Sequence, residues 1–365
     1  RTMATIPTPT LFPNVPLHRD KPTASLPPKL AADLVGIARL AADSPCAETK
    51  RGTEYFLLPV RSILNSCDSK RVPFPWTINP YRGCEFGCRY CYARYTHEFM
   101  ELDGSDFERK IYVKANAGPI VSRDLAEKHV PSEHIAIGSA TDPYQPAERE
   151  FGVTRAVLER IAERQGLSVS ITTKSDQVVR DIDLLKRISA RSSLTINVTI
   201  VTLRTRLARM LEPRAPRPDL RFAAVRKLRE AGLAAGVFMM PVLPGLTDSD
   251  PHFERMAYAA KDADAQWFAA SALFLMPSAA KEFLPFIEEK FPRLAKRYSE
   301  FYSHAAYPPD VYRREVSERL AKVRAKYGLG SRPQAPFRPE SDTQLSFSLG
   351  DTQPPLSTSW RNSIS

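Results

Sequence analysis

Short apolar runs alternate with helix-like segments over about 200 residues of this 365-residue chain. The runs are rich in β-branched and large apolar residues without strict polar alternation, which is typical of strands buried on both faces. We expect strands at 77–81, 110–114, 134–138, 168–173, 194–200, 236–240 and 267–273, and helices at 90–102, 153–165, 178–188 and 217–231. Strands that alternate with helices in this way predict parallel βαβ units.

Six or seven such units predict an α/β fold, a partial (β/α)6 barrel of the TIM type with extra C-terminal helices. An open doubly wound sheet is the alternative. Seven of the 32 prolines lie in the first 28 residues and five follow residue 331. Because proline lacks a backbone donor and fixes φ, both ends are expected to be extended or disordered. The expected organisation is a proline-rich, largely disordered segment at 1–54, a barrel domain at 55–280, basic helices at 281–330 and a disordered tail at 331–365.

The chain is basic, with 52 Lys and Arg against 41 Asp and Glu and a net charge of +11. Such an excess favours a polyanionic partner such as nucleic acid, and an ordinary solvated surface explains it equally well. Part of the excess lies in the expected C-terminal helices, at Lys290, Arg293, Lys296, Arg297, Arg313, Arg314, Arg319, Lys322, Arg324 and Lys326.

Three of the five cysteines lie within eight residues, in the sequence CEFGCRYCY at 84–92. An odd number of clustered cysteines suits metal or cluster ligation in a reducing compartment better than disulfides. We therefore expect a cytoplasmic protein. The longest apolar stretch, 231–246, is interrupted by glycines and prolines, which predicts no membrane span.

The spacing C-x3-C-x2-C at Cys84, Cys88 and Cys91 can hold three irons of a cubane cluster and leave the fourth iron open. An open iron can accept an amine and a carboxylate from a bound cofactor. Glycines at 83 and 87 suit a tight loop whose amides approach the cluster. Two alternatives stay open: a structural zinc site with His97, and a structural cluster with Cys46 or Cys67 as its fourth ligand.

The motif, followed by the βα pattern, resembles the radical SAM superfamily, and within it the branch of spore photoproduct lyase and DNA-repair-photolyase-like proteins. Beyond the cysteine motif, the resemblance rests on individually weak stretches that occur in the expected order. They are WTINPYRGC at 76–84, CYAR at 91–94, GSATDPYQPAE at 138–148, ITTKS at 171–175, LEPRAP at 211–216 and PVLPGLTD at 241–248.

The resemblance implies a [4Fe–4S] cluster and S-adenosylmethionine as cofactors. One electron from a donor such as flavodoxin or ferredoxin cleaves S-adenosylmethionine and yields a 5′-deoxyadenosyl radical, which abstracts hydrogen from substrate. The leading substrate class is nucleic acid or a nucleotide. The alternatives are a radical SAM enzyme acting on a peptide or small metabolite, and a non-catalytic, metal-stabilised nucleic-acid-binding protein.

The resemblance also marks candidate site residues, each of which has a simpler packing or surface role as its alternative. Tyr90 and Tyr92 flank Cys91 and match a pair that returns a hydrogen atom in the lyase. Candidate cofactor contacts are Tyr90, Ser139, Thr141, Asp142, Lys174 and Thr199. Glu212 and Arg214 are candidates to pair with each other or to reach the site.

One departure concerns the cysteine that returns a hydrogen atom in spore photoproduct lyase. This chain has no cysteine after Cys91, and the matching stretch holds only Gly138, Ser139, Ala140 and Thr141. A thymine-dimer lyase activity is therefore not expected from the resemblance alone.

Overall fold

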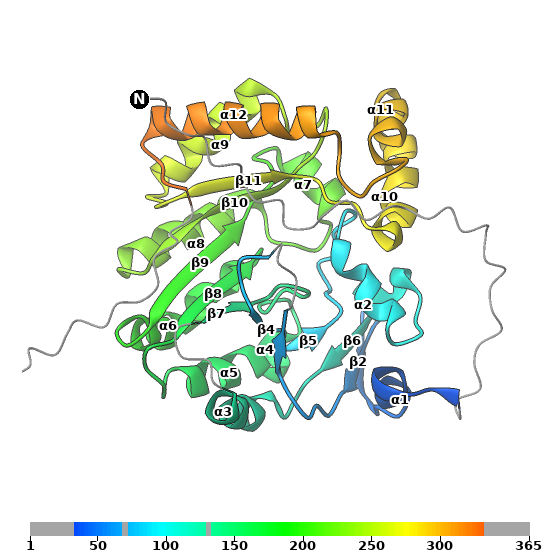
Figure 1. The fold of residues 1–365 in the computed structure, drawn as a ribbon, viewed down its shortest axis with the longest axis vertical. Coiled ribbons are helices and arrows are strands. Elements are labelled where there is room, and N and C mark those ends of the chain that lie inside the picture. The colour runs from blue at the N-terminus through cyan, green and yellow to red at the C-terminus, as the bar shows by residue number, and fades with distance from the viewer. Residues whose placement is uncertain (1–32, 68–71, 129–132, 332–365) are drawn as a thin grey trace, which may run out of the picture.

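The computed structural model describes residues 33–67, 72–128 and 133–331. Its main sheet has the strand order β11-β10-β9-β8-β7-β4-β3, in which all neighbours are parallel except the antiparallel edge strand β3. No ladder joins β3 to β11 within the described residues, so the six parallel strands form an open, partial barrel (Figure 1). The strands are β3 (Leu64–Ser66), β4 (Trp76–Ile78), β7 (His134–Ile137), β8 (Ser168–Thr173), β9 (Ser193–Thr199), β10 (Ala235–Val242) and β11 (Phe268–Ala272).

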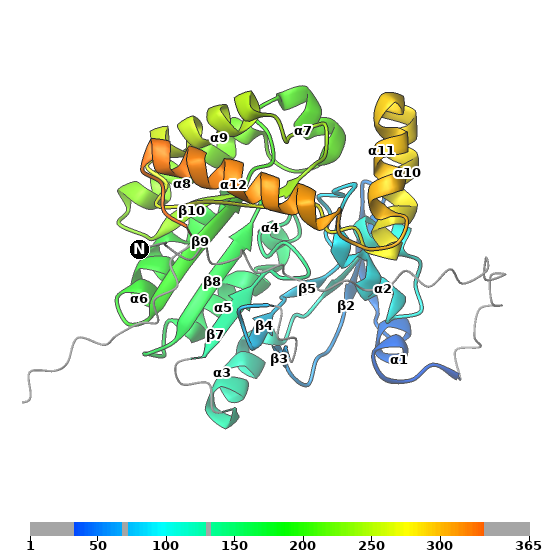
Figure 2. The ribbon, with the colours of Figure 1, turned by 45° about the horizontal axis from the view of Figure 1, so that its top comes forward.

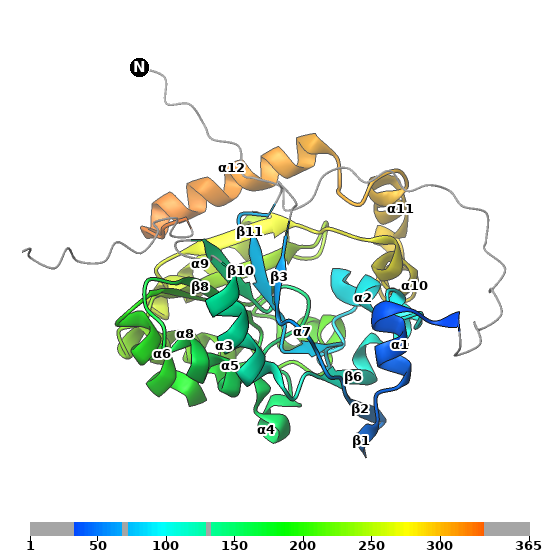
Figure 3. The same cartoon turned by 60° about the horizontal axis from the view of Figure 1, so that its bottom comes forward.

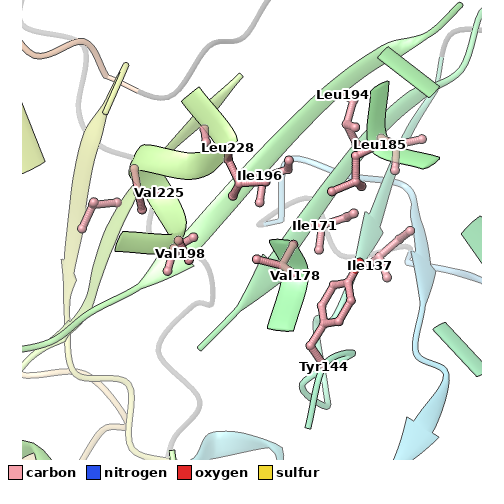
Figure 4. Packing of buried hydrophobic residues seen from close by; sticks show 14 of the residues in the cluster. Ile137, Tyr144, Ile171, Val178, Leu185, Leu194, Ile196, Val198, Val225 and Leu228 are labelled. Carbon is pink, nitrogen blue, oxygen red and sulfur yellow. The ribbon is translucent and has the colours of Figure 1, made fainter. Parts of the chain in front are cut away.

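Helices cover the outer face of this sheet (Figures 1 and 3). Strand side chains such as Ile171 and Ile196 pack against helix side chains such as Leu185 and Leu228 in one continuous core (Figure 4). Each fully buried aliphatic side chain contributes roughly 1.5–3 kcal/mol, so this face stabilises the barrel. The helices between the barrel strands are α3 (Ala117–Glu127), α4 (Glu148–Phe151), α5 (Val153–Ile161), α6 (Ile182–Ser189), α7 (Thr205–Leu211), α8 (Pro218–Glu230) and α9 (Asp250–Asp262).

A second, four-stranded sheet lies beside the barrel and has the order β1-β2-β6-β5. The strand expected at 110–114 belongs to this sheet, because it pairs with β2 and β5 and not with a barrel strand. The expected domain boundary at residue 55 falls inside the β1–β2 hairpin, and residues 33–54 are ordered. The elements are α1 (Gly36–Ala42), β1 (Cys46–Lys50), β2 (Thr53–Leu57), β5 (Tyr81–Arg82) and β6 (Lys110–Val113). The expected disorder at 1–32 and 332–365 lies outside the described residues.

The extra C-terminal helices are α10 (Pro277–Lys290), α11 (Pro292–Tyr302) and α12 (Asp310–Tyr327). Helix α12 crosses α9 and β11, whereas α10 and α11 stand together at the opposite end of the sheet (Figure 2). Six of their eleven Lys and Arg residues form ion pairs with Asp or Glu, which neutralises much of the expected basic face. The paired residues are Lys290, Lys296, Arg297, Arg313, Arg319 and Lys326.

Two segments differ from the sequence-based prediction. The helix expected at 90–102 is instead a 3-10 helix, η2 (Tyr92–Arg94), followed by one short turn of helix, α2 (Tyr95–Glu98). Strand β10 continues through Pro241, and its ladder with β11 shifts register between Met239 and Val242. A register shift leaves the position of a proline without a required ladder donor, so the strand tolerates it. None of the described helices has the length and apolar character needed to span a membrane.

Candidate functional site

The three cysteines lie on the loop between β5 and η2, which we call the cysteine loop (residues 83–91). Its backbone is fixed from both sides of the barrel opening. The Cys84 amide donates to the carbonyl of Phe107 at 3.0 Å, and the Arg89 amide donates to the carbonyl of Leu211 at 2.9 Å. A local turn closes the loop, because the Cys91 amide donates to the Cys88 carbonyl at 3.1 Å.

Gly83 begins the cysteine loop at φ +83°, and no other residue fits there. A Cβ at this position would lie 2.7 Å from the Lys110 carbonyl oxygen and 2.8 Å from that of Phe107. The Gly83 carbonyl accepts from the Thr141 hydroxyl at 2.6 Å and from the Gln145 side chain at 3.1 Å. Gln145 also accepts from the Glu85 amide at 3.0 Å, so the loop after β7 holds the first turn of the cysteine loop.

The three thiols fit the role of cluster ligands. Burial raises the pKa of each one, and for Cys88 and Cys91 the nearby charge of Lys174 acts in the opposite direction. Thiolates in such surroundings require positive charge close by, which cluster irons supply. No three His, Cys, Asp or Glu side chains among the described residues are grouped to hold one metal ion. A cubane does not need that grouping, since each cysteine binds a different iron.

On one side of the loop, which we call the Tyr90 side (Tyr90, Lys174, Glu212 and Arg221), charges are balanced. The buried Tyr90 hydroxyl donates to Glu212, and Arg221 Nη1 lies 2.6 Å from Glu212 Oε2. Arg221 and Glu212 are both fully buried, and Arg221 also donates to the Thr199 carbonyl at 3.0 Å. This network joins the cysteine loop to the end of β9.

Lys174 follows β8 and lies over the Tyr90 ring, with 5.9 Å between its Nζ and the ring centre. Burial lowers the pKa of Lys174, but the charges of Cys88, Glu212 and Asp142 outweigh burial and raise it. Asp142 accepts from the Lys174 amide at 2.6 Å and from the Thr173 hydroxyl at 2.6 Å. Lys174 is therefore held as a cation beside the cysteine loop.

The other side of the loop, which we call the Tyr92 side (Asn79, Arg82, Tyr92 and Lys114), is built on the ends of β4, β5 and β6. The Tyr92 hydroxyl donates to the carbonyl of Ser139. Asn79 accepts from the Ala140 amide at 2.8 Å and donates to the Ser139 hydroxyl at 3.0 Å. Lys114 Nζ donates to the Asn79 carbonyl at 2.6 Å.

The structure thus brings the candidate residues to both sides of the cysteine loop, in two kinds of role. Tyr90 belongs to the loop, and Tyr92 and Lys174 lie directly beside it. Thr141 and Asp142 use their polar atoms in hydrogen bonds that position the loop and Lys174. Of the two alternatives for Glu212 and Arg214, the pairing with each other does not form, and Glu212 bonds to Tyr90. Arg214 instead bonds to Thr53 and to the Glu108 carbonyl.

Sequence reasoning missed the partners that come from segments distant in the sequence. Gln145 and Arg221 are examples, although the stretches 138–148 and 211–216 drew attention to their neighbourhoods. Thr199 was expected as a cofactor contact, and it is 4% exposed at the end of β9. Its carbonyl supports Arg221.

The residues named for a structural zinc site (His97) and for a fourth cluster ligand (Cys46 or Cys67) lie in three different surroundings. His97 is fully buried between the rings of Phe107 and Tyr112, and its Nε2 bonds to the Lys110 carbonyl at 2.9 Å. Cys46 is exposed on β1. Cys67 is half-buried. Burial raises the pKa of Tyr92 most, and the charge of Cys67 also raises it, so Cys67 lies on the Tyr92 side of the loop.

Helices α10 and α11 complete the surroundings of the cysteine loop. Tyr90 meets Phe283 edge to face at 6.3 Å, and Phe283 meets Tyr298 at 5.7 Å. The cysteines and these aromatic residues form one buried cluster, separate from the barrel core. The basic C-terminal segment therefore covers the candidate site with its apolar side.

Comparison with known proteins agrees with this architecture. An uncharacterized protein of Mycobacterium tuberculosis is 34% identical over 296 residues, which cover 80% of this chain and 86% of the relative. An uncharacterized protein of Methanocaldococcus jannaschii is 31% identical over 217 residues, covering 60% and 76% of the two chains.

Among solved structures, spore photoproduct lyase complexed with dinucleoside spore photoproduct is similar in fold, with a TM-score of 0.57 at 16% identity over 76% of this chain and 80% of the lyase. A lyase mutant with bound AdoMet and dinucleoside spore photoproduct has a TM-score of 0.54 at 16% identity, over 73% and 77%.

The family model of the radical SAM superfamily matches residues 78–257, which include the cysteine loop and the strands from β7 to β10. Enzymes of this family use a [4Fe–4S] cluster and S-adenosylmethionine. The match excludes the alternative of a non-catalytic binding protein. The chain belongs to the radical SAM superfamily and is a radical SAM enzyme.

Proposed function

We propose that Cys84, Cys88 and Cys91 hold the [4Fe–4S] cluster of this enzyme and that S-adenosylmethionine binds next to it, on the Tyr90 side. The observation that carries the proposal is the buried cysteine loop, fixed through Gly83 at the carboxyl ends of the parallel strands. A reduced cluster held there would supply one electron to the sulfonium of S-adenosylmethionine, whose C5′–S bond would then break to give methionine and a 5′-deoxyadenosyl radical.

The residues of the Tyr90 side bind and orient S-adenosylmethionine. Lys174, whose pKa is raised, presents a cation that suits the carboxylate of S-adenosylmethionine, and the Tyr90 ring supplies a flat face beside it. Thr141, Asp142 and Thr199 position these groups through the bonds described above. Ser139 acts on the Tyr92 side, where it bonds to Asn79 and Tyr92. Tyr92 lies across the loop, where its hydroxyl is placed to relay a hydrogen atom during product formation.

The substrate that the chain favours is nucleic acid or a nucleotide. Support comes from the net charge of +11 and from cations near the loop that have no carboxylate partner among the described residues. The basic C-terminal helices contribute less than their composition indicates, because six of their eleven cations are paired with acids. The electron comes from a reducing protein such as flavodoxin or ferredoxin.

The test is anaerobic reconstitution with iron and sulfide, reduction in the presence of S-adenosylmethionine, and measurement of 5′-deoxyadenosine. We expect 5′-deoxyadenosine from the wild-type protein and none from Cys84→Ala, Cys88→Ala or Cys91→Ala. Cys46→Ala is the matched control, because Cys46 is exposed on β1, and it should behave as the wild type.

Retained cleavage in one of the three variants removes that cysteine from the ligand set. A protein that takes up zinc but no iron under these conditions contradicts the whole assignment. Lys174→Met should bind the cluster with an unchanged absorption spectrum but require a higher concentration of S-adenosylmethionine for half-maximal cleavage.

A further inference from the structure

Lys114 is a buried cation with few hydrogen-bond partners in the described part of the chain. It follows the last residue of β6 and is 5% exposed. Its ammonium group makes a single hydrogen bond within the described residues, to the Asn79 carbonyl at 2.6 Å. An ammonium has three donors, so two of them have no acceptor from the described chain.

Arg82 is a second cation close to Lys114. It lies on β5, which pairs antiparallel with β6, and Arg82 is directly opposite Tyr112 in the ladder. Its half-buried guanidinium makes one long hydrogen bond, 3.4 Å to the Thr96 carbonyl. Burial lowers the pKa of Lys114 to about 7, and the charge of Arg82 lowers it in the same direction.

No carboxylate balances this pair in the part of the chain that the structure describes. Neither Arg82 nor Lys114 belongs to an ion pair there, and no carboxylate is among the causes that shift the pKa of either one. Neighbouring cations do have acidic partners. Lys110 Nζ, on β6, lies 2.9 Å from Asp106 Oδ2, and Arg94 Nη1 lies 2.5 Å from Glu108 Oε2. Two like charges withdrawn from water without a counter-charge destabilise a fold, so such a pair indicates a place for an anion.

The position of the pair is functional, because it adjoins the cysteine loop. Lys114 bonds to Asn79, whose side chain holds Ser139, and the carbonyl of Ser139 accepts from Tyr92. The half-buried Tyr95 ring is also close, since Arg82 lowers its pKa against the larger effect of burial. Cations beside aromatic rings are the combination that binds phosphate and base in nucleic-acid sites.

We infer that Arg82 and Lys114 bind a phosphate group of the substrate on the Tyr92 side of the cysteine loop. The guanidinium offers a fork of donors that matches two phosphate oxygens, and the ammonium adds a point charge. A terminal phosphate monoester carries between one and two negative charges, which balances two cations better than a single carboxylate does, and a phosphodiester carries one charge on oxygens that the fork can bind. This inference rests on the proposed function for its identification of the anion as part of a nucleotide or nucleic acid.

The experiment measures the thermal midpoint of the anaerobically reconstituted full chain. The probes are inorganic phosphate, a 5′-mononucleotide and a short single-stranded oligonucleotide, each against sodium chloride at the same ionic strength. We expect the mononucleotide or the oligonucleotide to raise Tm by about 2–5 °C at a 100-fold excess over Kd. Lys114→Met should lose this rise. Lys110→Met, which removes a cation with an acidic partner from the same strand, should keep it.

A Tm rise that persists in Lys114→Met, or its absence from the wild-type protein, overturns the inference. A rise with inorganic phosphate alone, and none with the mononucleotide or oligonucleotide, also overturns it, because the anion is then not part of the substrate. If Lys114→Met does not fold, Arg82→Gln takes its place and should lose the same rise.

Binding in this experiment is measured without cleavage of S-adenosylmethionine. A protein that forms no 5′-deoxyadenosine but shows the phosphate-dependent rise contradicts the cleavage proposal and not the phosphate site. The opposite result contradicts only the phosphate site.

Discussion

The two sides of the cysteine loop solve the problem of buried charge in different ways. On the Tyr90 side, Lys174 and Arg221 face Glu212 and Asp142, so cations and anions from four separate segments balance within the protein. On the Tyr92 side, Arg82 and Lys114 have no acidic partner among the described residues. The Tyr90 side is therefore complete as a charge network, whereas the Tyr92 side gains its counter-charge from a bound molecule.

The largest effect should come from breaking the balanced side. Glu212→Gln leaves the fully buried Arg221 without its ion-pair partner, and we expect a loss of about 3–5 kcal/mol in the free energy of unfolding. Urea denaturation measures it. Asp262→Asn is the control, because its ion pair with Arg226 is exposed and should contribute no more than about 1 kcal/mol. Equal losses in both variants would mean that the Tyr90 side is not a buried network.

On the Tyr92 side, we expect a substitution to raise the free energy of unfolding instead of lowering it. Lys114→Met should raise the free energy of unfolding at pH 7 without phosphate, by about 1–4 kcal/mol, because it removes an unbalanced buried charge. The pKa of Lys114 is lowered in the folded state, so the unfolded state binds the proton more tightly and the penalty is largest below pH 7. The gain should therefore shrink as the pH rises from 7 toward 10. A variant that is less stable than the wild type at pH 7 contradicts the unbalanced pair.

Gly83 belongs to the cysteine loop, which lies between the Tyr90 side and the Tyr92 side. Its replacement tests how strongly the loop depends on glycine at this position. Gly83→Ala combines a positive φ with close approaches to two carbonyl oxygens, so we expect a loss of about 1–3 kcal/mol and reduced iron uptake. Gly87→Ala is the matched comparison. Gly87 also has a positive φ, but an added Cβ would meet only ordinary contacts at 3.7 Å. Losses of the same size would show that backbone conformation, and not the close approach, selects glycine at residue 83.

The smallest effect concerns His97, which lies behind the Tyr92 side. Burial lowers its pKa to about 4, and the charge of Arg82 acts in the same direction. Because the folded pKa is below that of the unfolded chain, this residue costs stability as the pH falls from 6.5 toward 4. Between pH 7 and pH 5 the wild type should lose about 1–2 kcal/mol more than His97→Gln. Parallel urea titrations at the two pH values measure this, and equal losses would place His97 in contact with water.

The sequence predicts local patterns well and distant pairings poorly. Six barrel strands and the cysteine spacing are contiguous patterns, and they lie where the sequence places them. The four-stranded sheet was not predicted, because β5 has two residues and β1 is mostly exposed, so neither shows a clear hydrophobic period. Glu212 and Arg214 were candidates to pair with each other or to reach the site. Glu212 lies beside Tyr90, and the fold brings Arg221 to it from the next helix. The Arg82–Lys114 pair depends on the ladder between β5 and β6, which no residue spacing in the sequence predicts.

The aromatic cover formed by Phe283, Tyr298 and Tyr302 has a consequence for the order of events during synthesis. The ribosome completes this cover about 200 residues after Cys91. At roughly 5–20 residues per second, the three thiols stand open for roughly 10–40 seconds before the helices that enclose them exist. Iron and sulfide delivered in that interval meet an accessible loop, whereas later delivery requires the C-terminal helices to separate from the barrel.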